Sequence, residues 1–120
     1  MPDTISVRDS GDNIVTISTI DRLINNDYET VAASQTAQVL GTTGAVGDTL
    51  SHLLIIPAST SPGAVSILDD ATSITVFTGG ASSVTTLIPF IVPLNLISVS
   101  GAWKVTTGAA VSVIAVGKFT

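Results

Sequence analysis

Trp103-Lys-Val-Thr-Thr-Gly-Ala-Ala-Val-Ser-Val-Ile-Ala-Val-Gly-Lys-Phe119 carries the clearest strand pattern of this chain and its single tryptophan. Trp103, Val105 and Thr107 fall on one face of an extended strand, and the run after Gly108 alternates again on its return. This pattern predicts a β-hairpin that is apolar on much of both faces. Because a strand with two apolar faces needs cover on both, we expect the pair inside a sandwich, or between a sandwich and a neighbouring subunit.

The chain from residue 28 onward is predicted to form further short strands separated by turn-rich connections. Val, Ile and Thr dominate the runs, as a pleated surface favours, and Gly, Pro, Ser and Asp fill the connections. The predicted fold class is all-β, a single antiparallel β-sandwich or jelly-roll-like domain with an extended N-terminal arm. Strand order stays open, because long-range pairing sets it. The predicted strands are 28–33, 36–40, 49–56, 64–68, 73–78, 84–90, 94–100, 103–107 and 110–116.

Two apolar runs carry positional information within that fold. The run Leu53-Leu-Ile-Ile56 is continuous and predicts a central strand. Pro89 and Pro93 interrupt the other run, at residues 87–94. Since proline cannot donate to the ladder, this segment is expected at an edge, a bulge or a bend between sheets.

The first 27 residues form a more polar arm ahead of the body at 28–120. Of the 4 basic and 9 acidic residues of the chain, eight lie in the first 29 positions. Residues 5–8 and 13–18 flank a turn-rich tetrad and predict a small hairpin, and residues 19–26 predict a helical turn. A two-stranded hairpin is marginally stable alone, so the arm should dock on the body, a neighbouring subunit or a partner. Its candidate interaction residues are Ile5, Val7, Arg8, Ile14, Ile17 and Arg22.

Charge is scarce in this sequence although no segment predicts a membrane span. Charged residues make up 11% of the 120 residues, against about 25% in an ordinary soluble domain, and the mean hydropathy is +0.61. The longest apolar run is broken by two prolines and falls short of the roughly 20 residues that a spanning helix needs. The N-terminus lacks the basic and apolar regions of a signal peptide. We therefore expect one domain with much of its surface buried against other chains.

Composition also excludes some partners and sites. The net charge of -5 argues against nucleic acid, whose affinity for proteins comes largely from Lys and Arg. The absence of cysteine excludes disulfides and thiolate metal sites and leaves the redox compartment open.

Two groups of residues have both a chemical and a structural interpretation. His52, the single histidine, follows Ser51 and comes four residues after Asp48, which is the composition of a hydrolytic triad. Adjacent strand residues point to opposite faces, however, so Ser51 and His52 are not expected to meet. Asp69 and Asp70 offer oxygen ligands to Ca²⁺, but a hairpin turn joining 64–68 to 73–77 is the preferred interpretation.

Two further groups also have a preferred structural interpretation. The glycines of residues 41–47 resemble a phosphate loop, but the Lys and the helix that follow in that motif are missing, which favours a flexible connection. Trp103 and Tyr28 are candidates for an aromatic sugar platform, whereas core packing is the commoner fate of a lone Trp. We expect no catalytic, cofactor-binding or metal-binding residues and no enzymatic activity.

Several segments resemble small virion proteins of tailed bacteriophages, of the type that decorates or cements the capsid. The resemblance runs through Leu-Leu-Ile-Ile-Pro-Ala-Ser-Thr-Ser-Pro-Gly-Ala-Val-Ser-Ile at 53–67 and Ile-Thr-Val-Phe-Thr-Gly-Gly at 74–80. It continues in Leu-Ile-Pro-Phe at 87–90 and Gly-Ala-Trp-Lys-Val-Thr-Thr-Gly-Ala at 101–109, and the opening at 5–17 is similar to the start of some phage structural proteins.

The resemblance implies a β fold, a symmetric oligomer and no catalysis. It leads to the hypothesis of a homotrimer that binds the major capsid protein at the virion surface after synthesis in the host cytoplasm, without nucleic acid or membrane as partner. A receptor- or glycan-binding module of a head or tail fibre remains the alternative, and an enzyme is a distant third.

Overall fold

The computed structural model describes residues 5–8, 14–17 and 26–120. In the arm, β1 (Ile5–Arg8) and β2 (Ile14–Ile17) pair antiparallel, with Ile5 opposite Ile17. This pairing confirms the small hairpin that the sequence predicts. The predicted helical turn at 19–26 lies, except for Asn26, outside the described residues.

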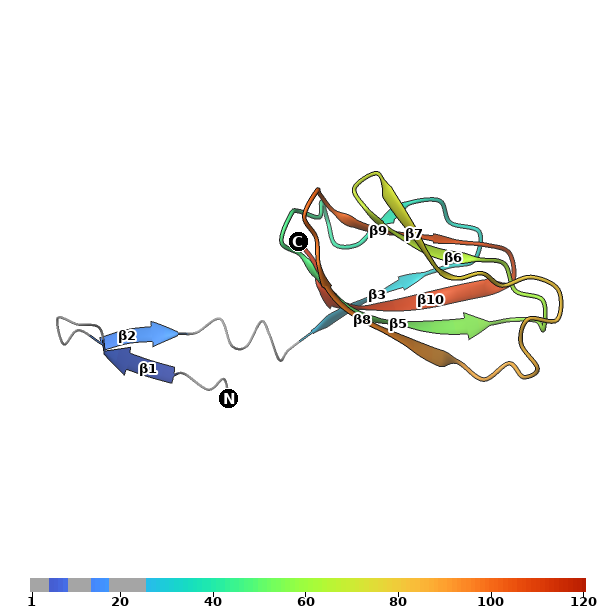
Figure 1. The fold of residues 1–120 in the computed structure, drawn as a ribbon, viewed down its shortest axis with the longest axis horizontal. Coiled ribbons are helices and arrows are strands. Elements are labelled where there is room, and N and C mark those ends of the chain that lie inside the picture. Colours follow the sequence, from blue (N-terminus) through green and yellow to red (C-terminus); the bar gives the residue numbers. More distant parts are fainter. Residues whose placement is uncertain (1–4, 9–13, 18–25) are drawn as a thin grey trace.

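The body consists of two four-stranded antiparallel sheets with no helix in residues 26–120 (Figure 1). The first sheet has the order β3-β10-β5-β8 and the second the order β4-β9-β6-β7. The prediction of an all-β sandwich is confirmed. The strands are β3 (Asp27–Val31), β4 (Gln38–Val39), β5 (Thr49–Pro57), β6 (Val65–Asp69), β7 (Thr72–Phe77), β8 (Phe90–Ile97), β9 (Trp103–Thr107) and β10 (Val111–Lys118).

The strand pairs are nested around the β6–β7 hairpin. Outside that hairpin β5 pairs with β8, β4 with β9 and β3 with β10, as in one long ribbon folded on itself. The ribbon is rolled, so that β10 also pairs with β5 and β9 also pairs with β6. Eight strands in two sheets with this order form a jelly roll, one of the two architectures that the sequence left open.

The predicted hairpin over residues 103–119 is wrong, because β9 and β10 belong to different sheets. The chain crosses from one sheet to the other at Gly108-Ala109-Ala110, where Ala110 has a φ of 58°. Both strands send alternate residues into the core from opposite sides. A hairpin and a crossover between sheets therefore leave the same alternating pattern, and only the pairing partners distinguish them.

The region around the two prolines also differs from its prediction in detail. The strands expected at 84–90 and 94–100 are one strand, β8, and residues 84–89 lie outside any strand. β8 is the edge of its sheet, and its register with β5 shifts between Leu50 and His52, opposite Asn95, whose φ is 55°. Pro93 is tolerated because an edge strand need not donate on both sides. Of the three expected positions the edge is confirmed for residues 90–94, and the expectation of a central β5 is also confirmed.

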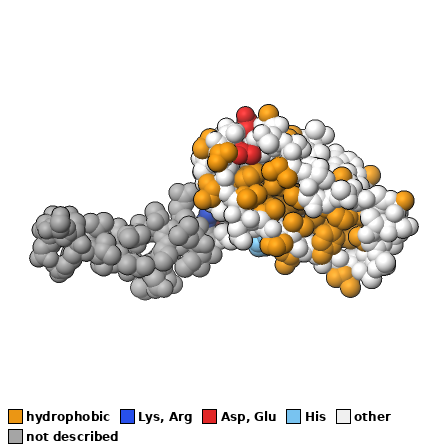
Figure 2. Space-filling view, in the orientation of Figure 1, with side chains coloured by type: hydrophobic (Ala, Val, Ile, Leu, Met, Phe, Trp, Pro, Cys, Tyr) orange, Lys and Arg blue, Asp and Glu red, His pale blue; other side chains and the backbone are white. Residues whose placement is uncertain are grey.

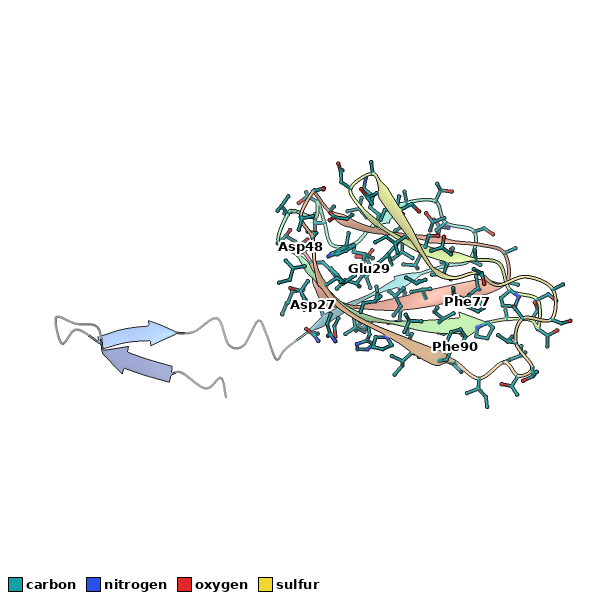
Figure 3. All side chains as sticks on the ribbon, in the orientation of Figure 1. Asp27, Glu29, Asp48, Phe77 and Phe90 are labelled. Carbon is teal, nitrogen blue, oxygen red and sulfur yellow. The ribbon has the colours of Figure 1, made fainter. Side chains whose placement is uncertain are left out.

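The core lies between the two sheets and is built from the inward residue of each alternating pair. Its two flanks are closed differently (Figure 3). On one flank, Phe77 of β7 and Phe90 of β8 meet edge to face with ring centroids 5.3 Å apart. On the other, Glu29 accepts hydrogen bonds from Gln38 Nε2 at 2.9 Å and from the Gly41 amide at 2.8 Å. The buried apolar residues are Val31, Leu40, Leu50, Leu53, Ile55, Val65, Ile67, Trp103, Val105, Val111, Val113 and Ala115.

Candidate interaction surface

The candidate triad at His52 does not form, although one of its contacts does. Ser51 Oγ lies 3.1 Å from His52 Nδ1, contrary to the expectation that neighbouring strand residues diverge. The register shift in the pairing of β5 with β8 falls here, so the local backbone is not a regular strand. Asp48 is engaged elsewhere, since its carboxylate accepts hydrogen bonds from the Ala45 and Thr120 amides at 3.0 and 3.1 Å. In the described part of the chain no carboxylate contacts the imidazole of His52, so the Ser-His-Asp arrangement of a hydrolase is incomplete.

The carboxylate of Asp69 holds a loop. It accepts hydrogen bonds from the amides of Val99, Ser100 and Gly101 at 2.9, 3.1 and 3.1 Å. The bond from Val99, aided by the other two, lowers the pKa of Asp69 below its ordinary value of 3.8, against the opposing effect of burial. Asp70 has a φ of 56° and takes part in the tight turn between β6 and β7, as the structural interpretation predicts. Within residues 26–120 no cluster of His, Asp and Glu side chains could hold a metal ion.

Trp103 cannot serve as a sugar platform. Its side chain is 2% exposed, and its Nε1 donates a hydrogen bond of 2.9 Å to the carbonyl of Asp48. Tyr28 is 72% exposed, whereas Trp103 is buried, so the two rings do not lie together on the surface as a sugar platform requires. The core-packing interpretation of the tryptophan is confirmed.

The glycine-rich connection at 41–47 uses its amides within the protein. Thr42 and Thr43 donate to the carbonyl of Thr120 at 2.9 and 3.2 Å, and Gly47 donates to the carbonyl of Ser98 at 3.0 Å. These amides are therefore not free to cradle a phosphate, and the segment is a connection between β4 and β5.

Four buried polar side chains brace the loops at the ends of the sandwich, and we call Asp48, Asp69, Ser98 and Thr107 the loop braces. Thr107 Oγ1 donates to the Ala32 carbonyl at 2.6 Å and accepts from the Gln35 amide at 3.0 Å. Among the described residues no buried polar side-chain atom lacks a partner. The sequence analysis missed the role of Thr107, because its partners lie 72 and 75 residues away and leave no local signal.

The surface of the body is apolar in several places. Figure 2 shows hydrophobic side chains spread across the visible side of the body, with few charged atoms among them. Exposed apolar patches of this extent are typical of surfaces that contact other chains. The large hydrophobic residues that are exposed are Tyr28, Val46, Ile74, Leu87, Ile88, Ile91, Ile97 and Val99.

The outer face of the first sheet carries three of these side chains, Tyr28, Ile91 and Ile97, together with half-buried apolar residues of β5 and β10. In an antiparallel sheet alternate residues point away from the core, and the register aligns those of neighbouring strands. One row joins Thr30, Ile114, Leu54 and Ile91 across the four strands. We call this surface the outer face; its apolar members are Tyr28, Leu54, Ile56, Ile91, Pro93, Ile97, Ile114 and Val116.

The opposite surface, on the second sheet, is built differently. The two sheets have the same architecture, so a general preference of strands for β-branched residues applies equally to both. The second sheet nevertheless points mainly polar groups outward, with Leu68 as the apolar residue at its centre and Val39 on its short edge strand. Its outward residues are Val39, Ser66, Leu68, Ser73, Thr75, Lys104 and Thr106.

The interaction residues predicted in the arm are not brought into this surface by any described contact. Ile5, Val7 and Arg8 belong to β1, and Ile14 and Ile17 belong to β2. Their side chains, and the whole of Arg22, lie outside the described structure. Their role stays a prediction.

Comparison with known proteins found no relative of this chain. No protein-family model, no curated protein and no solved structure matches this chain. In the part of the chain that the structure describes, no helix is long and apolar enough to cross a membrane.

Proposed function

We propose that this protein is a structural virion protein that decorates and stabilises a bacteriophage capsid, binding the major capsid protein as a homotrimer. The observation that supports this proposal is the distribution of exposed apolar side chains over several sides of the body. The outer face, the loop at Leu87 and Ile88, and the loop at Val99 each need cover. A chain held between sister subunits and a capsid has such contacts on more than one side.

The buried polar groups support a structural role over a chemical one. The loop braces form their hydrogen bonds with backbone amides and carbonyls of the same chain and, for Asp48, also with the Thr120 hydroxyl. The jelly roll adds an analogy at the level of the fold, since this architecture occurs in viral capsid domains and also in lectins. The lectin alternative loses its proposed platform, because Trp103 is buried.

The bound protein stabilises the capsid by bridging neighbouring capsid subunits. A trimer placed across capsomer junctions resists separation of the subunits that it joins. Stable specific contacts typically bury about 1,200 to 2,000 Å², and a bound trimer makes its second and third contacts intramolecularly, so that weaker single contacts suffice. In this mechanism the arm, residues 1–27, grips the capsid, and the body faces hold the trimer together.

Removal of the arm tests the proposal. The deletion ends at residue 26, because Asp27, the last residue assigned to the arm, is the first residue of β3. A chain that starts at Asp27 keeps all of β3, including the contact of 3.5 Å between Asp27 Oδ1 and Lys118 Nζ. Both this chain and the full-length chain are mixed with capsids assembled without the protein and are then sedimented. We expect the full-length chain to co-sediment at saturable occupancy and the shortened chain to stay in the supernatant with an unchanged circular dichroism spectrum.

Two results would count against the proposal. Full occupancy of the capsids by the shortened chain would show that the body, and not the arm, binds the capsid. Failure of the full-length chain to bind any such capsid, at concentrations where it is oligomeric, would contradict the decoration function itself.

A further inference from the structure

We propose that the outer face is the contact between copies of this chain, packed around the symmetry axis of the oligomer. This inference rests on the proposed function only in that the protein forms a homo-oligomer. It assigns the contact to the sheet β3-β10-β5-β8 and excludes the second sheet from it.

The contrast between the two sheets carries the first step. Leu54 and Ile114 stand opposite each other at the centre of the outer face, and Ile91 extends the row with 61% of its surface exposed. At the equivalent central position of the second sheet, Leu68 stands between Lys104 and Ser73. An antiparallel sheet that faces water alternates apolar and polar residues, and the second sheet does so. The first sheet, in contrast, carries apolar residues on its outward side as well as on its core side, which is typical of a sheet that is covered on both sides.

The distribution of charge identifies the occupant as a second copy. Near the axis of a cyclic oligomer each residue meets its own counterpart, so any charge there meets a like charge. The chain has a net charge of -5, yet neither acidic residue of the four strands lies within the outer face, because Glu29 bonds to Gln38 and the Gly41 amide and Asp27 is the first residue of β3. The one lysine of the face, Lys118, lies at the end of β10 beside Asp27. A face with so few charges can pack against a second copy of itself without repulsion between like charges. A partner that is recognised by charge complementarity would have, apart from Lys118, no charged group on this face to pair with.

The size of the face predicts the strength of the contact. Four strands about 4.8 Å apart, with about 3.3 Å per residue along β8 from Ile91 to Ile97, cover roughly 450 Å². Two such faces together approach the roughly 1,000 Å² at which specific contacts begin. We therefore expect association that depends on protein concentration and that avidity on a capsid reinforces.

A matched pair of substitutions tests the assignment. Leu54→Glu places a carboxylate at the centre of the outer face, and Leu68→Glu makes the same change at the centre of the second sheet. Native mass is measured by light scattering over a wide concentration range, and folding is checked by circular dichroism. We expect Leu54→Glu to raise the concentration for half assembly by at least about 30-fold, the loss typical of one hot-spot residue, and Leu68→Glu to leave it unchanged.

If Leu54→Glu does not fold, Ile91→Glu makes the same test on the exposed edge strand of the same row. A wild-type chain that is monomeric at every concentration, an unchanged oligomer in Leu54→Glu, or an equal loss in Leu68→Glu would overturn the inference. The capsid assay separates this result from the proposed function. A chain that assembles through the outer face but binds no capsid overturns the function alone, and a monomer that binds capsids overturns the inference together with the trimer but leaves the decoration role standing.

Discussion

Thr107→Val tests whether the loop braces stabilise the sandwich. The substitution keeps the shape of the side chain and removes its hydroxyl, which is 2.6 Å from the Ala32 carbonyl and 3.0 Å from the Gln35 amide. Thr107 is only 4% exposed, so water replaces these partners poorly. Each lost bond costs about 1 kcal/mol, and more where a partner is left unsatisfied, which predicts a loss of about 2 to 3 kcal/mol in the free energy of unfolding.

Thr106→Val is the matched control on the neighbouring residue of β9. Its hydroxyl accepts one bond, from the Ala37 amide at 2.9 Å, and its side chain is on the half-buried outer side of the second sheet. Because water can reach this site, we expect a loss of about 0.5 to 1 kcal/mol.

Urea unfolding, followed by circular dichroism at a concentration where the chain is monomeric, measures both losses. The loss in Thr107→Val should also appear as a fall of about 10 to 20 °C in the thermal midpoint, given a domain of this size, and the fall in Thr106→Val should be smaller. A Thr107→Val variant within about 0.5 kcal/mol of wild type, or an equal loss in Thr106→Val, would refute the idea that burial makes the brace strong.

Two further predictions concern the other buried polar contacts. Because its pKa is lowered in the folded state, Asp69 contributes stability above its ordinary pKa of 3.8, and this contribution is lost as the pH falls through the lowered value. Acid titration of the unfolding free energy should show this loss in the wild type and a smaller one in Asp69→Asn; identical acid profiles would contradict it. Trp103→Phe removes the 2.9 Å bond from Nε1 to the Asp48 carbonyl, which keeps its bond from the Ser98 amide, and should lower the unfolding free energy by about 1 to 2 kcal/mol. A denaturant midpoint equal to that of the wild type would show that this bond contributes little.

The candidate site was predictable only in part. Burial of Trp103 and the turn at Asp69 and Asp70 followed from composition and local turn chemistry. The contact between Ser51 and His52 did not, because it depends on a bulge that the pairing with β8 creates. The outer face was expected only as an unspecified apolar surface, since its members come from four strands whose order no local pattern encodes.

The sequence by itself determined where most of the strands lie, because side-chain alternation and turn residues act over a few positions. It also predicted that much of the apolar surface is buried against other chains, which stays a prediction. The tertiary structure alone decided that β9 and β10 lie in different sheets and that the strands roll into a jelly roll. It also decided that Thr107 braces a loop 72 residues away. These features depend on which distant segments pair, and pairing is chosen by the burial of the whole core rather than by any one stretch of chain.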